Sequence, residues 1–136
     1  MNDTDPAPSN EGIGVSLVGG DSTILRSRQM MLRSDGYDVR SYATGAALLA
    51  DPRSRDYPCI IVDDQEALSI SLLRAMRETG WRGKGIILNG TLAGSSLMDD
   101  ADKHGDKMFE GPVSDASLLA AVASTIYRGW AGWNAV

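Results

Sequence analysis

The amino-acid sequence predicts an α/β fold with a doubly wound, five-stranded parallel sheet. Strand-like segments alternate with segments whose apolar residues recur at helical spacing, and this βα order repeats five times. The segment Cys59–Val62 is continuously apolar, as in parallel strands that are covered on both faces. Glycine, proline, aspartate and serine cluster between these segments and indicate turns. Together these observations predict helices on both faces of the sheet.

The first half of the chain contains two strand–helix units after a polar segment. Residues 1–12 contain prolines and no periodicity, so we expect a disordered N-terminal tail. The predicted strands are Ile13–Val18 and Tyr37–Tyr42. Asp21 or Ser22 opens the first helix, which ends at Asp35–Gly36, and Thr44 opens a short helix over Gly45–Ala50. The inward face of the first helix is predicted to carry Ile24, Leu25, Met31 and Leu32.

The second half contains the remaining three units. The predicted strands are Cys59–Val62, Gly85–Leu88 and Met108–Glu110. Predicted helices start near Leu68, near Ser95 and at Ser114 or Asp115, and the last carries Leu118, Leu119, Val122 and Ile126 inward. We expect one domain over residues 13–128, followed by a C-terminal tail over 129–136 that contains Trp130 and Trp133.

Length and composition limit the classes of function. A chain of 136 residues is the size of one domain. The net charge of −5 and the pI near 4.7 disfavour binding to nucleic acid or to an anionic membrane. A single cysteine, Cys59, excludes an internal disulfide, and no apolar stretch is long enough to span a membrane. We therefore expect a cytoplasmic protein.

The most informative site residue is Asp63, which ends the predicted central strand. Parallel sheets place their chemistry at the carboxyl ends of the strands, where Asp63 is expected. A strand-end aspartate can also simply accept bonds from loop amides or cap the next helix. The only histidine, His104, lies in a predicted helix-to-strand connection, so the sequence offers no Ser/His/Asp arrangement. We expect a protein that is not an enzyme.

From about Gly14 to Tyr127, the chain resembles the receiver (CheY-like) domain of two-component response regulators. The resemblance rests on the five βα units, on Ile61-Val62-Asp63, and on Gly111-Pro112, where the family has Lys-Pro. The stretches Leu32–Val39 and Leu118–Val122 also read like receiver sequence. The resemblance implies a flavodoxin-like fold and makes Asp63 the equivalent of the phosphoacceptor aspartate.

The chain departs from the family at the other positions of its phosphorylation site. The resemblance implies two metal-binding acids where this chain has Gly19 and Gly20, and a hydroxyl where it has Asn89. It likewise implies a lysine at Gly111 and a switch aromatic at Met108. A phosphoryl group of about −2 charge would therefore lack its usual cations. We predict no metal site; Asp63 and Asp21 are weak candidates, and Asp21 is the better helix cap.

These observations predict a pseudo-receiver that acts through phosphorylation-independent protein–protein contact. One alternative is a working single-domain response regulator phosphorylated on Asp63 by a histidine kinase, and only this reading needs Mg²⁺. A second is an anion- or nucleotide-binding module, because Gly19–Gly20 lead into a helix N-terminus. No other cofactor is expected.

The expected partner is a signalling protein such as a histidine kinase or another regulator, and homodimerisation stays open. The candidate partner surface combines an acidic group with the two tail tryptophans: Asp99, Asp100, Asp102, Trp130 and Trp133. The tryptophans can anchor a partner or fold back onto the domain. With the acid cluster mostly lost, Asp63→Asn is expected to change stability by less than about 1 kcal/mol.

Overall fold

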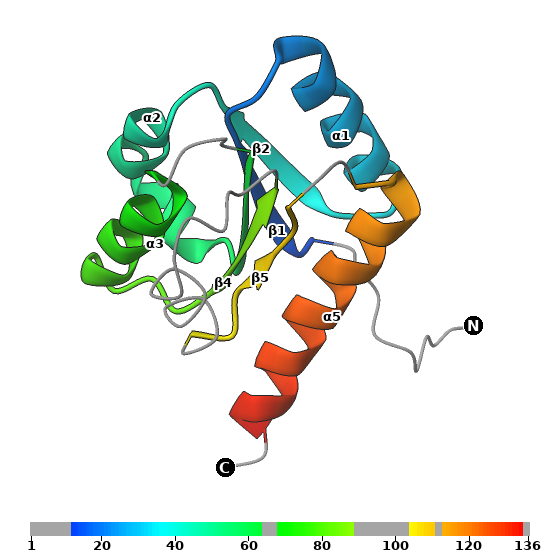
Figure 1. The fold of residues 1–136 in the computed structure, drawn as a ribbon. Coiled ribbons are helices and arrows are strands. Elements are labelled where there is room, and N and C mark those ends of the chain that lie inside the picture. Colours follow the sequence, from blue (N-terminus) through cyan, green and yellow to red (C-terminus); the bar gives the residue numbers. More distant parts are fainter. Residues whose placement is uncertain (1–11, 64–67, 89–103, 111–112, 135–136) are drawn as a thin grey trace.

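The structure, a computed structural model, describes residues 12–63, 68–88, 104–110 and 113–134, and for Leu68 and residues 127–134 it describes the backbone alone. The strands are β1 (Gly14–Val18), β2 (Asp38–Tyr42), β3 (Cys59–Asp63), β4 (Lys84–Leu88) and β5 (Lys107–Met108). The helices are α1 (Ser22–Ser34), α2 (Gly45–Ala50), α3 (Leu68–Glu78) and α5 (Asp115–Asn134), with a 3₁₀ turn over Pro52–Asp56. Figure 1 shows their arrangement.

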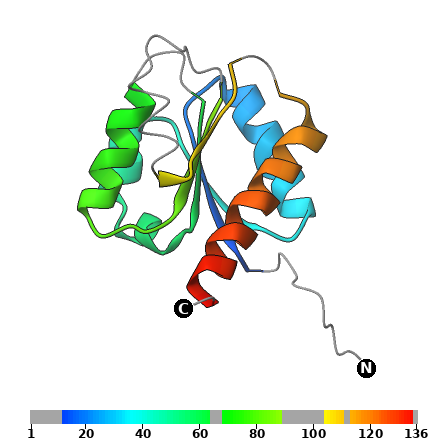
Figure 2. The ribbon, with the colours of Figure 1, turned by 60° about the horizontal axis from the view of Figure 1, so that its bottom comes forward.

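The five strands form one parallel sheet in the order β2-β1-β3-β4-β5, which confirms the predicted fold class. Leu17 in β1 lies opposite Ser41 of β2 and Ile61 of β3. Helices α1 and α5 cover one face of the sheet, and α2 and α3 cover the other (Figure 2). The chain therefore leaves β1 and β3 toward opposite faces. The carboxyl ends of β1 and β3 therefore mark the topological switch point, where open α/β sheets place their sites.

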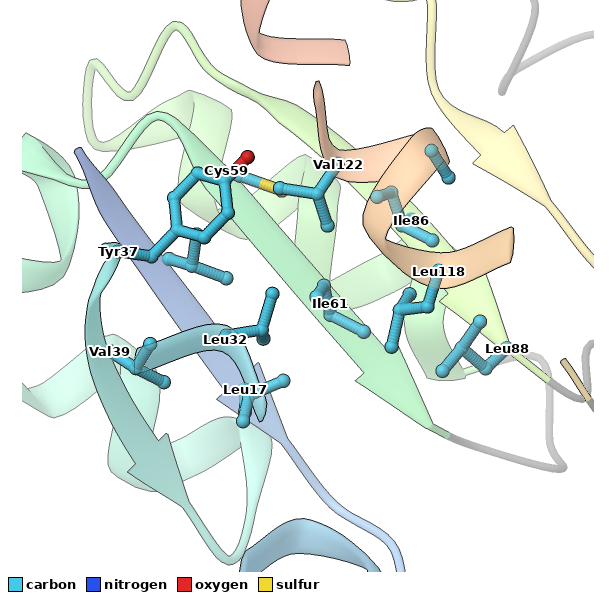
Figure 3. Packing of buried hydrophobic residues seen from close by; sticks show 12 residues of the cluster. Leu17, Leu32, Tyr37, Val39, Cys59, Ile61, Ile86, Leu88, Leu118 and Val122 are labelled. Atoms are coloured by element: carbon cyan, nitrogen blue, oxygen red, sulfur yellow. The ribbon is translucent and has the colours of Figure 1, made fainter. Parts of the chain in front are cut away.

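Two apolar clusters, one on each face, hold the layers together. Because side chains alternate along a strand, Cys59 and Ile61 of β3 face α1 and α5, while Ile60 and Val62 face α2 and α3. Figure 3 shows the first cluster, in which Leu32, Leu118 and Val122 bring the two helices onto the sheet. Cys59 is a core residue, and its burial raises the pKa of the thiol to about 12.

The helix starts follow the predicted caps. The Oδ1 atom of Asp21 accepts a bond from the Thr23 amide at 2.7 Å, and Thr44 Oγ1 accepts one from the Ala47 amide at 3.1 Å. After α1, Gly36 has a φ of 98°, as expected of a residue that ends a helix in the left-handed region. The predicted inward face of α1 is wrong at Ile24, which is 45% exposed, because it lies roughly a quarter turn around the helix from Leu25 and Leu32, which pack on the sheet core.

The C-terminal part differs from prediction in two places. The last strand was predicted at Met108–Glu110 but pairs with β4 through Lys107 and Met108. Helix α5 continues to Asn134, so residues 129–134, which the sequence assigned to a tail, continue that helix. Its last turns run past the sheet (Figures 1 and 2). Among the described residues, no helix is long and apolar enough to cross a membrane.

A buried ion pair fixes β5 against α3. Arg77 of α3 binds Asp106, the residue before β5, through two bonds of 2.7 and 3.0 Å. The side chain of Asp106 is only 2% exposed. It also accepts a bond of 2.7 Å from the Gly85 amide of β4, while the Arg77 guanidinium stacks on Trp81 with its central carbon 5.1 Å from the ring centre. One carboxylate thus joins a helix to two strands.

Candidate functional site

Asp63 ends β3 at the switch point of the sheet, as predicted. Its neighbour at this edge is the loop after β1, where Gly19 and Gly20 have φ values of 77° and 88°. The Gly19 amide donates to the Tyr42 carbonyl at 3.0 Å, which ties this loop to the end of β2. The loop after β1 thus lies between the end of β2 and Asp63 at the end of β3.

The Asp63 carboxylate forms an ion pair with Arg28. The guanidinium Nη1 of Arg28, on α1, lies 2.6 Å from Asp63 Oδ2. The Arg28 and Asp63 side chains are 15% and 10% exposed, so the pair is largely removed from water. A charge-assisted bond at this distance is among the stronger hydrogen bonds in proteins. The structure thus places a cation of the chain itself on the acid at the switch point.

The loop after β1 packs directly on Asp63. A Cβ atom built on Gly19 would lie 2.8 Å from the Asp63 carbonyl oxygen, and one on Gly20 would lie 3.1 Å from Asp63 Oδ2. Both glycines have positive φ, which L side chains rarely adopt. In this backbone conformation a side chain at Gly19 would collide with the Asp63 carbonyl, and a side chain at Gly20 would press on the Asp63 carboxylate and be strained by the positive φ.

A cavity of about 540 Å³ lies beside Asp63, on the side of α2 and α3. The ends of β1 and β3 form its floor, and Ala43–Ala46, Leu49, Ser71, Leu72 and Ala75 form its walls. Most of these side chains are small and apolar. Among the lining residues that the structure describes, Asp63 is the one with an ionisable side chain.

The other predicted site residues divide into three groups. Asp21 caps α1, and Met108 is half-buried and packs against the cluster under α2 and α3. Trp130 and Trp133 lie on the last turns of α5. The remaining residues lie outside the described part of the chain: Asn89, Asp99, Asp100, Asp102 and Gly111. Within the described ranges, no three His, Cys, Asp or Glu side chains gather in a way that could hold a metal ion.

Arg28 was not predicted as a site residue, although its position in the sequence carries a signal. Arg28 lies three residues after Leu25 and four before Leu32, so it falls on the inward stripe of α1. A charged residue on that stripe near the carboxyl ends of the strands needs a partner of opposite charge. Asp63 is the acid that the predicted topology places nearest, and the long arginine side chain can reach it.

Comparisons with known proteins agree on the fold. No family model and no curated protein matches the sequence. A CheY-like receiver domain protein from Methanospirillum hungatei superposes with a TM-score of 0.74 at 19% identity, covering 90% of this chain and 99% of that one. The receiver domain of a LuxO-type repressor from Vibrio parahaemolyticus gives 0.72 at 17%, covering 89% and 95%. A CheY-type chemotaxis protein from Vibrio cholerae gives 0.69 at 18%, covering 84% and 98%. The receiver-domain fold that the sequence resembled is thereby confirmed.

Proposed function

We propose that this chain is a pseudo-receiver of a two-component or phosphorelay system that signals through protein contact without phosphorylation of Asp63. The observation that carries the proposal is the Arg28–Asp63 ion pair. In the receiver family, the equivalent aspartate attacks phosphorus with the help of Mg²⁺ and a lysine. Here one carboxylate oxygen is engaged at 2.6 Å by the chain's own guanidinium, which neutralises the charge that would draw a cation.

Those residues around Asp63 that the structure describes do not fit a magnesium site. Mg²⁺ requires oxygen ligands in octahedral geometry and is usually held by one or two carboxylates. Gly19 and Gly20 supply no side-chain oxygen, and their positive φ disfavours any side chain at these two positions. Arg28 also places a positive charge where the ion would approach the carboxylate. These features support a receiver fold that works without the metal.

The alternative, phosphorylation on Asp63, would make Arg28 the counter-ion of the phosphoryl group. Arginine binds phosphate well, but its single charge faces about −2 on the phosphoryl group. Asp63 would also have to release Arg28 before its oxygen could attack. Because both side chains are at most 15% exposed, that release leaves two poorly solvated charges. The geometry therefore favours an ion pair that persists.

The proposal predicts that Mg²⁺ does not bind at Asp63 with a Kd below about 1 mM, the upper end for weak protein cation sites. The measurement is isothermal titration calorimetry with MgCl₂ at constant ionic strength, with Asp63→Ala as the matched control. We expect the two proteins to give the same heats. Saturable binding well below that concentration, lost in Asp63→Ala, would favour the phosphorylated response regulator instead.

A further inference from the structure

The cavity beside Asp63 has the size and the position of a site for a small molecule. Its volume of about 540 Å³ lies within the range of about 300–1,000 Å³ that is typical of ligand pockets. Helices α2 and α3, which lie side by side on one face of the sheet, form its walls (Figures 1 and 2). The ends of β1 and β3 form its floor at the switch point, where α/β sheets bind their ligands.

The residues of the two helices keep this space open. A Cβ atom built on Gly45 would lie 3.1 Å from Leu72 Cδ1, so α2 and α3 are already in contact there and cannot move closer. The neighbouring wall residues Ala46, Ser71 and Ala75 have small side chains, which leave the remaining space unfilled. The cavity therefore results from the packing of two regular helices.

The lining is mostly apolar and has few polar groups. Leu49 lines the cavity and is 37% exposed, so an apolar ligand can remove part of this side chain from water. Thr44 and Ser71 supply hydroxyl groups. The Thr44 oxygen accepts a bond from the Ala47 amide, and its own proton can be donated to a ligand. Such a lining suits a mainly apolar molecule with one hydrogen-bonding group.

Charge disfavours an ionic ligand. Among the lining residues that the structure describes, only Asp63 has an ionisable side chain, and its carboxylate repels phosphate and carboxylate groups. Arg28 reaches Asp63 from α1, which lies on the opposite face of the sheet (Figure 2). Because this ion pair balances the charge of Asp63, a cationic ligand gains little as well. A nucleotide or a free phosphate, one of the alternatives from the sequence, therefore does not fit this cavity.

We propose that the cavity between α2 and α3 binds an uncharged, largely apolar small molecule with one hydrogen-bonding group. Such a ligand contacts Gly19, Gly20 and Asp63 on the cavity floor without displacing Arg28. The burial of apolar surface on both molecules drives the binding. This inference does not rest on the proposed function, because the cavity depends on the packing of two helices and not on the phosphorylation of Asp63.

Two dyes with the same aromatic rings test the class of ligand. N-phenyl-1-naphthylamine is uncharged, whereas 8-anilinonaphthalene-1-sulfonate carries a sulfonate on these rings, and both fluoresce more strongly in an apolar site. We expect the uncharged dye to bind the full chain with a Kd below about 100 μM, and the sulfonate to bind at least about tenfold more weakly. No saturable binding of the uncharged dye, or equal or tighter binding of the sulfonate, would overturn the proposal.

Matched substitutions test where the dye binds. Ala46→Phe fills the cavity from α2 and should weaken binding of the uncharged dye at least about tenfold. Ala47→Phe is the control, because position 47 is exposed and does not line the cavity, so its Kd should equal that of the wild type. Ser71→Phe fills the cavity from α3 and replaces Ala46→Phe if circular dichroism shows that the latter does not fold. Unchanged binding in the folded cavity-filling variants, or equal weakening in Ala47→Phe, would contradict the proposal.

Discussion

Arg77→Ala is expected to lower the free energy of unfolding by about 3–5 kcal/mol, the range for removal of one partner of a buried ion pair. The substitution leaves the Asp106 carboxylate, only 2% exposed, without its two bonds from the guanidinium. It also removes the stacking of Arg77 on Trp81. Asp106 joins α3 to β4 and β5. Without the positive charge of Arg77 beside this carboxylate, we expect that side of the sheet to become less stable. Urea denaturation followed by circular dichroism measures the effect.

Two variants make this prediction specific. Arg74→Ala changes an exposed arginine on the same helix, and surface substitutions of this kind usually cost less than about 1 kcal/mol. Arg77→Lys keeps the charge but cannot bond Asp106 with two parallel N–H groups, so its stability should fall between wild type and Arg77→Ala. An Arg77→Ala protein no less stable than Arg74→Ala would show that the buried pair contributes little.

Separating Arg28 from Asp63 is expected to have the second-largest effect. Arg28→Ala removes a charge-assisted bond of 2.6 Å and leaves a carboxylate that is 10% exposed, so we expect a loss of about 2–3 kcal/mol. Asp63→Asn leaves Arg28 with a neutral acceptor, so we expect a loss of about 1–2 kcal/mol. The sequence alone suggested a smaller effect because it did not reveal the guanidinium. Arg26→Ala, an exposed arginine on the same helix, is the control.

The sign of the Asp63→Asn effect distinguishes the two accounts of the site. In a receiver that keeps its cluster of acids, removal of one negative charge relieves repulsion and raises stability. In this chain the carboxylate faces a cation, so the same substitution should lower stability. A double-mutant cycle with Arg28→Ala should give a coupling energy of about 0.5–3 kcal/mol. A stabilised Asp63→Asn protein, or additive effects of the two changes, would contradict the ion-pair account.

The parallel sheet, the order of its elements and the starts of α1 and α2 could be predicted because each leaves a local pattern. The unbroken apolar run Cys59–Val62 needs two covered faces, and it lies in the sheet centre between β1 and β4. Asp21 and Thr44 cap their helices with their own side chains, a contact that depends only on residues two or three positions away. The position of Asp63 at the switch point followed from the same topology.

The contacts around Asp63 and Asp106 could not be predicted with the same ease, because they join residues far apart in the chain. Arg28 and Asp63 are 35 positions apart, and Arg77 and Asp106 are 29 apart. Strand β5 has only two residues, too few for a pattern, and its position follows from pairing with Ile86 and Ile87. The glycines at 129 and 132 favoured a tail, yet the backbone continues α5 through both.

The guanidinium of Arg28 holds Asp63, and we propose that this ion pair keeps the site from accepting a phosphoryl group. The most direct measurement is the amide spectrum of ¹⁵N-labelled protein during addition of Mg²⁺ and beryllofluoride, a mimic of the phosphoryl group. We expect the amide signals of Gly19, Gly20 and residue 63 to stay where they are, both in the wild type and in Asp63→Ala. Saturable shifts of these three signals in the wild type, absent in Asp63→Ala, would contradict this proposal.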